Sequence, residues 1–243
     1  MRVATYNLLK GGSKRMHWVR MLVDFQVDLL LAQESFPHCE HLPPFMFPDI
    51  GKQAAWESVK GRAWGSAVLS TTGVVSPISV PGYQGWVVGA RITRASWQRR
   101  NGDPLLVFSV HAPSNGQAYA TQVNRILDKI KSIAGTQELV IGGDFNISVS
   151  HFPCSERPTS KRDLKIQERL ADEFNLVNCW QTANPEQPLH QTLRWTGDRT
   201  TAYHCDGIFV PKRWRKRLRS CLVLAGDEWN SLSDHNPIIA EFE

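Results

Sequence analysis

The sequence predicts an α/β fold in which two mixed β-sheets pack on each other with helices on the outside. Short β-rich apolar runs alternate with a few amphipathic helical segments along the chain. Some strands are separated by so few residues that only a turn fits between them, so antiparallel as well as parallel pairs are expected. Two packed sheets flanked by helices account for the large number of strands. No repeat or linker interrupts the pattern, and residues 1–243 are expected to form a single domain.

Eight apolar runs are expected to form strands, and three amphipathic segments are expected to form helices. The strands are Val3–Tyr6, Asp28–Ala32, Ser66–Ser70, Trp86–Ile92, Leu105–Val110, Leu139–Ile141, Cys205–Val210 and Ile238–Phe242. The helices are Lys14–Phe25, Tyr119–Ile133 and Leu164–Phe174. Ser13 is a suitable N-cap for the first helix, and Gly135 is a stop signal after the second.

The composition is typical of a globular protein, with 42% hydrophobic and 21% charged residues. No apolar run reaches the roughly 20 residues that a membrane helix needs. The amino terminus resembles a strand rather than a signal peptide. We therefore expect a cytoplasmic, monomeric protein without a membrane anchor or an evident protein partner.

The five cysteines form no C-x-x-C pair, so neither a disulfide framework nor a structural zinc site is expected. They are Cys39, Cys154, Cys179, Cys205 and Cys221, and free thiols in a reducing compartment are the expected state. The net charge of +5 favours polyanionic partners, although many basic proteins bind none.

Polar residues lie at the ends of many predicted strands, which is the most informative feature of the sequence. Strands packed in one sandwich carry their end residues to a common rim, where loops build functional sites. One acidic residue after a strand is unremarkable, but eight such positions form a pattern. They are Asn7, Glu34, His111, Asp144, Asn146, Asp206, Asp234 and His235.

These residue types match the requirements of phosphodiester hydrolysis. The transition state gathers negative charge, so the site needs a divalent metal or positive groups beside it. Mg²⁺ prefers oxygen ligands and keeps several waters, so one or two carboxylates hold it. A water must be deprotonated and aimed, and the leaving oxygen must be stabilised or protonated.

Six short motifs follow one another along the chain at these strand ends. The Gly-Asp-Phe-Asn element and the terminal Ser-Asp-His are the most specific of them. The motifs are Thr5-Tyr6-Asn7, Gln33-Glu34, Ser109-Val110-His111, Gly142-Gly143-Asp144-Phe145-Asn146, Cys205-Asp206-Gly207-Ile208-Phe209-Val210 and Ser233-Asp234-His235-Asn236-Pro237. In this order they resemble the motif set of the endonuclease/exonuclease/phosphatase family. The resemblance runs from Asn7 to the carboxyl terminus, and it implies a four-layer α/β/β/α sandwich with the site at one rim.

The resemblance also implies which residues bind a metal. Glu34 is implied as the principal ligand of Mg²⁺, for which Mn²⁺ can substitute. Asp234 is implied to lie near the metal, directly or through water. Asn7 is implied to contact phosphate or a metal-bound water; the alternative is that its amide only satisfies backbone groups.

The same resemblance assigns the catalytic roles. Asp144 is expected to orient or deprotonate the attacking water, and Asn146 to hold a phosphate oxygen. The alternative for both is an Asx turn after a strand. His235 is expected to contact a phosphate oxygen or transfer a proton, with Asp206 holding its ring in one tautomer.

His111 bears on the subclass. Abasic-site endonucleases of the family carry tyrosine in this part of the site. Pancreatic-type deoxyribonucleases, and phosphodiesterases that act on lipid or on protein–DNA adducts, carry histidine there. The sequence therefore departs from the abasic-endonuclease pattern.

Three further residues are candidates for substrate binding. Trp195 lies where family members often place an aromatic residue that lines the substrate pocket. Arg213 and Arg215 belong to the densest charge run, 212–219, which is either a solvated face or a phosphate-binding surface. A second basic cluster comprises Arg91, Arg94, Arg99 and Arg100, with Trp97 between them.

The sequence therefore predicts a metal-dependent phosphodiesterase that acts on nucleic acid. One alternative is a phosphomonoesterase or a phospholipid or inositol-phosphate phosphodiesterase of the same fold. Another is a non-catalytic nucleic-acid-binding module. No nucleophile-elbow, phosphate-loop or H-E-x-x-H motif supports a different class of hydrolase.

Overall fold

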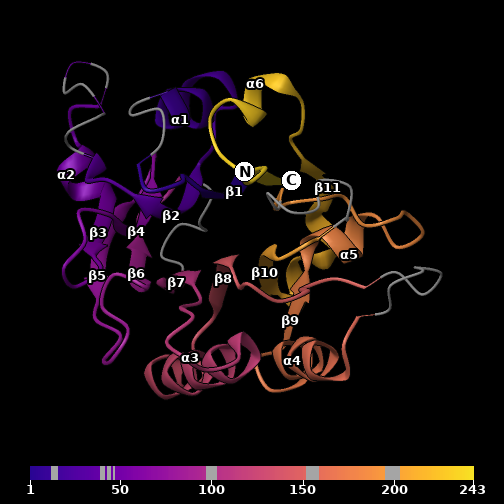
Figure 1. Cartoon of the computed structure of the whole chain (residues 1–243). Coiled ribbons are helices and arrows are strands. Elements are labelled where there is room, and N and C mark those ends of the chain that lie inside the picture. Colours follow the sequence, from indigo (N-terminus) through magenta and orange to yellow (C-terminus); the bar gives the residue numbers. More distant parts are fainter. Residues whose placement is uncertain are drawn as a thin grey trace.

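Two six-stranded sheets form the centre of the protein (Figure 1). The computed structural model describes residues 1–11, 16–38, 42, 45, 47–96, 103–151, 159–194 and 203–243. The first sheet has the strand order β11-β12-β1-β2-β4-β3, and the second has the order β5-β6-β7-β8-β10-β9. The strands are β1 (Arg2–Asn7), β2 (Leu29–Ser35), β3 (Ala54–Ser58), β4 (Gly65–Ser70), β5 (Val74–Ile78), β6 (Val87–Thr93), β7 (Leu105–His111), β8 (Leu139–Asp144), β9 (Leu176–Asn178), β10 (Asp206–Pro211), β11 (Leu218–Val223) and β12 (Ile238–Phe242).

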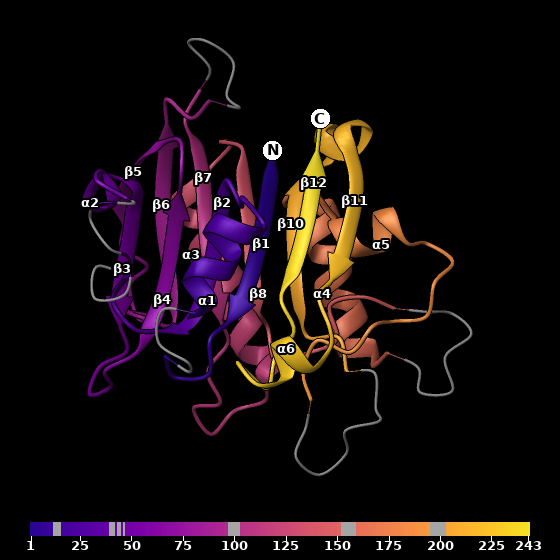
Figure 2. The ribbon, with the colours of Figure 1, turned by 90° about the horizontal axis from the view of Figure 1, so that it is seen from above.

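Each sheet has a parallel pair at its centre and antiparallel pairs on both sides. In the first sheet β1 runs parallel to β2, and in the second β7 runs parallel to β8. The carboxyl ends of these four strands reach the same edge of the sandwich, opposite the two chain termini (Figure 2). This edge, called the rim below, is where the predicted polar residues meet.

Helices cover the outer face of each sheet, which completes four layers (Figure 1). The helical segments on the first sheet include α1 (Met16–Val19), the π-helical η1 (Arg20–Asp24), α2 (Ile50–Gln53) and α6 (Asp227–Asn230). The long helices α3 (Tyr119–Ala134) and α4 (Lys161–Asp172) cover the second sheet. Shorter elements are α5 (Cys179–Ala183) and the 3₁₀ helix η3 (Lys212–Arg217). The predicted α/β/β/α sandwich is confirmed.

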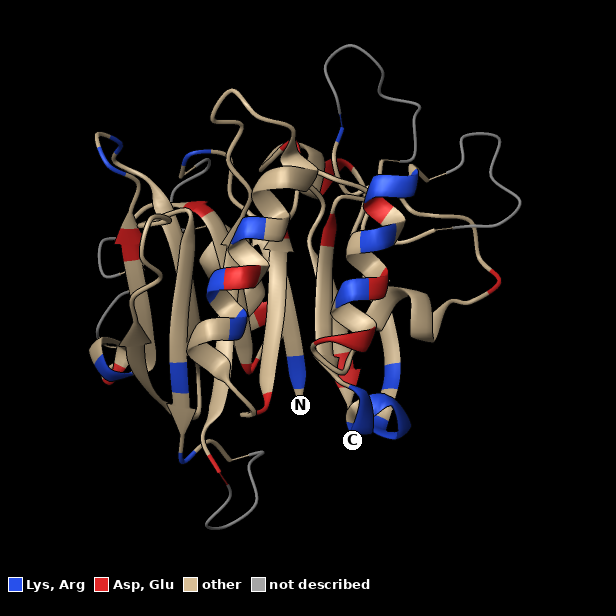
Figure 3. Ribbon diagram, turned by 90° about the horizontal axis from the view of Figure 1, so that it is seen from below, with Lys and Arg blue, Asp and Glu red and all other residues tan. Residues whose placement is uncertain are grey.

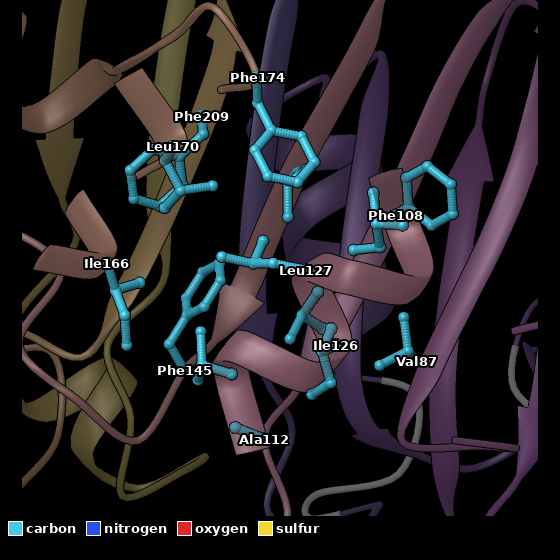
Figure 4. Packing of buried hydrophobic residues seen from close by; sticks show 14 of the residues in the cluster. Val87, Phe108, Ala112, Ile126, Leu127, Phe145, Ile166, Leu170, Phe174 and Phe209 are labelled. Carbon is cyan, nitrogen blue, oxygen red and sulfur yellow. The ribbon is translucent and has the colours of Figure 1, made fainter. Parts of the chain in front are cut away.

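Three apolar cores separate these layers. The core between the sheets includes Leu31, Val107 and Ile208. The core beneath α3 and α4 is shown in Figure 4, where Leu127 and Leu170 point from the helices toward the second sheet. Burial of apolar side chains on both faces explains why the inner strands are almost continuous apolar runs.

The two long helices follow from local sequence signals. In α3 the buried residues Val123, Ile126, Leu127 and Ile130 recur at helical spacing, so one face packs on the sheet. The helix ends at Gly135, which has a φ of 56° that glycine adopts without strain. No helix among the described residues is both long and apolar enough to cross a membrane.

All eight predicted strands are present, and the structure adds β3, β5, β9 and β11. The predicted second and third helices correspond to α3 and α4. The first predicted helix is divided between α1 and η1, and it starts at Met16 within the described residues. Its predicted cap, Ser13, lies outside them.

Candidate active site

Strand register brings the residues at the centre of the rim side by side. His111 of β7 pairs with Asp144 of β8, and Asp144 pairs in turn with Asp206 of β10. Gly143 makes this alignment possible: its φ is 148°, and a Cβ there would lie 1.9 Å from the carbonyl oxygen of Val110. Glycine is therefore required at position 143 for β7 and β8 to approach each other so closely.

Glu34 reaches the site because β2 carries an irregularity in its pairing with β4. The pairing passes from Ala32 opposite Ala67 to Ser35 opposite Gly65, so β2 contains one residue more than its partner. Glu34 lies in this bulge with a φ of 48°, a conformation rare for residues with a side chain. Such a bulge redirects a side chain away from the regular alternation of the strand.

Asparagine side chains and backbone amides surround the carboxylate of Asp144. The amide nitrogen of Asn7 donates to Asp144 Oδ2 over 3.1 Å, and the backbone N–H of Asn146 donates to Asp144 Oδ1 over 2.9 Å. Asn146 has a φ of 52°, a second strained backbone position in the site. Burial raises the pKa of Asp144, whereas the two nearby histidines oppose that increase.

His235 forms a buried pair with Asp206. Its Nδ1 lies 2.9 Å from Asp206 Oδ2, and its Nε2 lies 3.7 Å from Asp144 Oδ2. Burial alone would lower the pKa of His235, but the carboxylates of Asp206 and Asp144 outweigh it and raise the pKa to about 10. The imidazole is therefore a cation at neutral pH, with Nδ1–H donating to Asp206.

His111 approaches Asp144 from the other side, in a different environment. Its Nε2 lies 3.8 Å from Asp144 Oδ2 and 3.6 Å from Glu34 Oε1. Its ring packs near Trp86 and Trp64, with ring centroids 5.1 and 5.9 Å away. Burial lowers the pKa of His111 to about 4, with partial opposition from Asp144, so this imidazole is neutral at pH 7.

A clamp built from Thr192 and Arg194 holds the two segments that carry Asp206 and His235. The hydroxyl of Thr192 accepts the backbone N–H of Asp206 over 3.1 Å, and its carbonyl accepts the N–H of Asn236 over 2.7 Å. The Arg194 guanidinium donates to the side chain of Asn236 and to the carbonyl oxygen of Ser233. Sequence reasoning assigned no role to either residue, because a lone threonine and arginine carry no local signal of these contacts.

A buried polar network joins the two sheets behind the site. The amide nitrogen of Gln33 donates to Ser109 Oγ over 2.9 Å, and Ser109 Oγ donates to the carbonyl oxygen of Ala32 over 3.0 Å. Thr5 adds a hydroxyl contact to Gln33. Buried polar groups that are satisfied in this way fix the relative position of β2 and β7. The network therefore fixes the spacing between Glu34 and His111.

Two groups of side chains at the rim could hold a metal ion. Asp144, Cys205, Asp206 and His235 offer ligand atoms within 4.8 Å of one another. In this cluster the Nδ1 of His235 and Oδ2 of Asp206 already bind each other, and burial raises the pKa of the Cys205 thiol. Glu34 offers a simpler fit, because its buried Oε2 has no hydrogen-bond partner in the described structure.

The surroundings of Glu34 are also acidic. Burial raises the pKa of this carboxyl, and the charges of Asp144 and Asp234 raise it further, whereas His235 and Lys10 lower it. A buried carboxylate with an unsatisfied oxygen and two acidic neighbours is suited to a hard divalent cation. The predicted ligands Glu34 and Asp234 thus lie close enough to interact.

The predicted arginine site does not form part of the rim. Arg213 and Arg215 lie in η3, which follows the end of β10 remote from Asp206, roughly 20 Å away along the strand. Arg213 forms an ion pair with Glu138 instead. Figure 3 shows this basic segment beside the carboxyl terminus, at the opposite end of the sandwich. A run of basic residues in the sequence does not indicate at which end of the fold it lies.

The remaining basic cluster is also remote where it is described. Arg91 is opposite Leu106 near the start of β7, so it lies away from the end that carries His111. Trp97, Arg99, Arg100 and the pocket candidate Trp195 lie outside the described residues. Trp64 and Trp86 are aromatic residues at the rim that sequence reasoning did not select.

Comparison with known proteins adds family information to this geometry. The model of the endonuclease/exonuclease/phosphatase family matches residues 4–235. A *Xenopus laevis* protein described as the transposon TX1 uncharacterized 149 kDa protein is 25% identical over 140 residues, which are 57% of this chain. The match spans about 10% of the length of that relative.

Solved structures share the fold at low sequence identity. An AP endonuclease from *Archaeoglobus fulgidus* has a TM-score of 0.72 and 18% identity, with 100% of this chain and 99% of that chain covered. The endonuclease domain of TRAS1, a telomere-specific non-LTR retrotransposon, has a TM-score of 0.64 and 16% identity, with 100% and 98% covered. The 3′ phosphatase NExo from Neisseria, bound to a product DNA hairpin, has a TM-score of 0.67 and 19% identity, with 100% of this chain and 99% of that chain covered.

Proposed function

Because this chain belongs to the endonuclease/exonuclease/phosphatase family, we propose that it is a divalent-metal-dependent phosphodiesterase that cuts nucleic acid. The observation that carries the proposal is the arrangement around Asp144. One neutral and one cationic imidazole face the same carboxylate oxygen at 3.8 and 3.7 Å. A base next to a fixed cation suits in-line attack of water on a phosphodiester.

Each residue of this group has a separate task in the proposed reaction. Asp144 accepts a proton from the attacking water, and its raised pKa makes it a stronger base than an ordinary aspartate. The Nε2–H of His235 donates to a non-bridging phosphate oxygen, where negative charge develops. Asp206 keeps the opposite ring nitrogen protonated and the ring oriented. Asn7 and Asn146 hold the base in place.

Glu34 is the proposed metal ligand, with Asp234 nearby. The cation would neutralise charge on the phosphate and stabilise the leaving oxygen. Mg²⁺ is favoured over a softer metal because the donors around Glu34 are oxygens. The cluster that contains Cys205 would suit a softer ion, and its hydrogen-bonded His235–Asp206 pair is assigned to phosphate binding instead.

Nucleic acid is the proposed substrate class for two reasons. Relatives described as endonucleases, and one described as a 3′ phosphatase bound to DNA, share this fold. The net charge of +5 is also favourable for a polyanion. His111 in place of tyrosine argues against a specific preference for abasic sites, so ordinary phosphodiester linkages are the proposed target.

The test is cleavage of end-labelled single-stranded DNA, duplex DNA, abasic duplex and RNA, each in Mg²⁺ and in excess EDTA. We expect cleavage only with the metal. Glu34→Gln should need at least about tenfold more Mg²⁺ for half-maximal rate, because it loses one ligand charge. Glu168→Gln, at an exposed position of α4, is the matched control and should retain the metal dependence of the wild type.

Two outcomes would contradict the proposal. Full activity in EDTA would exclude the metal mechanism, and an unchanged metal dependence in Glu34→Gln would exclude Glu34 as a ligand. Release of phosphate from a 3′-phosphorylated oligonucleotide, without cleavage of internal linkages, would identify a phosphomonoesterase instead.

A further inference from the structure

A cavity adjoins the active site on the side of α3 and α4. It has a volume of about 640 Å³, within the usual range of small-molecule sites. Its wall includes Tyr119 at the start of α3, Lys161 and Arg162 in the first turn of α4, and Asn146 and Tyr203. None of these residues except Asn146 belongs to the catalytic group described above.

Asn146 links this cavity directly to the catalytic carboxylate. Its backbone N–H donates to Asp144 Oδ1 over 2.9 Å, and its carbonyl oxygen accepts the hydroxyl of Tyr203 over 2.9 Å. One residue is therefore in contact with the base on one side and lines the cavity on the other. A polymer whose scissile phosphate lies at Asp144 would extend past Asn146 into this cavity.

The charges in the cavity favour an anion. Lys161 and Arg162 are exposed, and neither forms an ion pair with a described residue. The carboxylate of Asp163 also lines the cavity and accepts the backbone N–H of Ser148 at Oδ2 over 3.2 Å, but the two cations outnumber it. Arg169, farther along the same helix, contrasts with them because it pairs with acidic neighbours. The rim end of α4 thus offers uncommitted positive charge.

An aromatic ring completes the set of groups. Tyr119 lines the cavity and is half-buried, with part of its side chain packed against the core beneath α3. Phosphate-binding cations beside an aromatic face are the usual components of a site for single-stranded nucleic acid. A cavity of this size accommodates a nucleotide unit rather than only an inorganic anion.

We propose that this cavity binds the nucleotide next to the scissile phosphate, with Lys161 and Arg162 on its phosphodiester and Tyr119 against its base. This inference rests on the proposed function and adds a substrate contact to it. It also assigns phosphate binding to a basic site that adjoins the rim, rather than to the remote run 212–219 (Figure 3).

The experiment compares two double variants that lose the same charge. Lys161→Gln/Arg162→Gln removes both cations from the cavity. Lys212→Gln/Lys216→Gln removes two exposed cations from η3, at the opposite end of the sandwich. Each protein is assayed on 12-mers of single-stranded DNA and RNA over a salt series, and on bis-p-nitrophenyl phosphate, with Mg²⁺ present.

The cavity variant should lose at least about tenfold in the ratio of kcat/KM on the oligonucleotide to kcat/KM on the small diester. The magnitude of its slope of log kcat/KM against log salt should fall by roughly 0.7 relative to the wild type, since one phosphate contact on a single strand is lost. The η3 variant should match the wild type in both measures. Tyr119→Leu should lower oligonucleotide kcat/KM several-fold with an unchanged salt slope.

Equal ratios and equal slopes in the two double variants would overturn the cavity assignment while leaving the proposed function intact. Failure of the wild type to cut either oligonucleotide would overturn the cavity assignment, and failure to cut duplex DNA as well would contradict the proposed function.

Discussion

The two sides of the rim place the same type of side chain next to the same carboxylate, but one imidazole is cationic and the other is neutral. His235 lies in an acidic wall formed with Asp206, and its pKa is raised to about 10. His111 lies in an aromatic wall formed with Trp64 and Trp86, and its pKa is lowered to about 4. Both rings are buried, so exposure does not distinguish them.

The difference shows that the neighbours of a buried histidine decide its charge. Burial lowers the pKa in both cases, and only the acidic wall supplies a carboxylate at hydrogen-bond distance from the ring, at 2.9 Å. One site thereby contains a cation that can bind the phosphate and a neutral imidazole that can donate or accept a hydrogen bond. Groups whose pKa values are moved apart in this way are typical of acid–base catalysis.

The largest expected effect comes from removal of the charge that distinguishes the acidic wall. Asp206→Asn should lower kcat on the best oligonucleotide by about 10³-fold, because His235 loses its proton and its orientation. His235→Ala should cause a loss of similar size. The loss of kcat in the double variant should be about equal to the loss in either single variant, since the two residues act as a unit.

Steady-state and single-turnover kinetics of the three variants check this prediction. Multiplicative losses in the double variant would mean that the two residues act independently, and the acidic wall would then not be one functional group. Asp227→Asn, at an exposed position of α6 outside the pair, controls for loss of an aspartate carboxylate elsewhere.

A smaller effect is expected from the aromatic wall, on stability rather than rate. Between pH 6.5 and about 4, the unfolded chain binds a proton at His111 that the folded protein excludes, so stability falls as the pH decreases. Between pH 6.5 and about 10 the folded state binds the extra proton at His235, so that contribution is lost as the pH rises.

His111→Gln should remove the loss of stability that the protonation of His111 causes below pH 6.5. Relative to the variant, the wild type should lose about 2 kcal/mol of unfolding free energy between pH 7 and pH 4.5. Urea unfolding in EDTA measures the difference, and His151→Gln, at an exposed histidine, should behave as the wild type does. If His111→Gln and the wild type lost stability in parallel, His111 would not be the neutral partner.

The sequence predicted the inner strands of both sheets and missed the edges, for a physical reason. The four unpredicted strands, β3, β5, β9 and β11, are the outermost strands of the two sheets. The burial of Val74–Ile78 and Leu218–Val223 is interrupted by exposed positions, so neither is a continuous apolar run. Edge strands are defined by their partners, which a single-sequence pattern does not contain.

The site residues were likewise predictable only where their signal is local in the sequence. The positions of four residues were predictable because each lies at or next to the end of an inner strand, and the end of a buried run is visible in the sequence: Asn7, Glu34, His111 and Asp144. Thr192, Arg194 and the cavity side chains were not, because their roles depend on contacts between distant segments. The basic run 212–219 left two interpretations open for the reverse reason: its charge was evident in the sequence, but its position at the end of β10 remote from Asp206 was not.

Single-turnover cleavage by Asp144→Asn, together with binding of the same labelled oligonucleotide, tests the central claim most directly. Both walls face this carboxylate, so its loss should slow cleavage by about 10³-fold or more while affinity changes only by about a factor of a few. That result would identify Asp144 as the base of a nucleic-acid phosphodiesterase. Cleavage by Asp144→Asn at a rate close to that of the wild type would contradict the account.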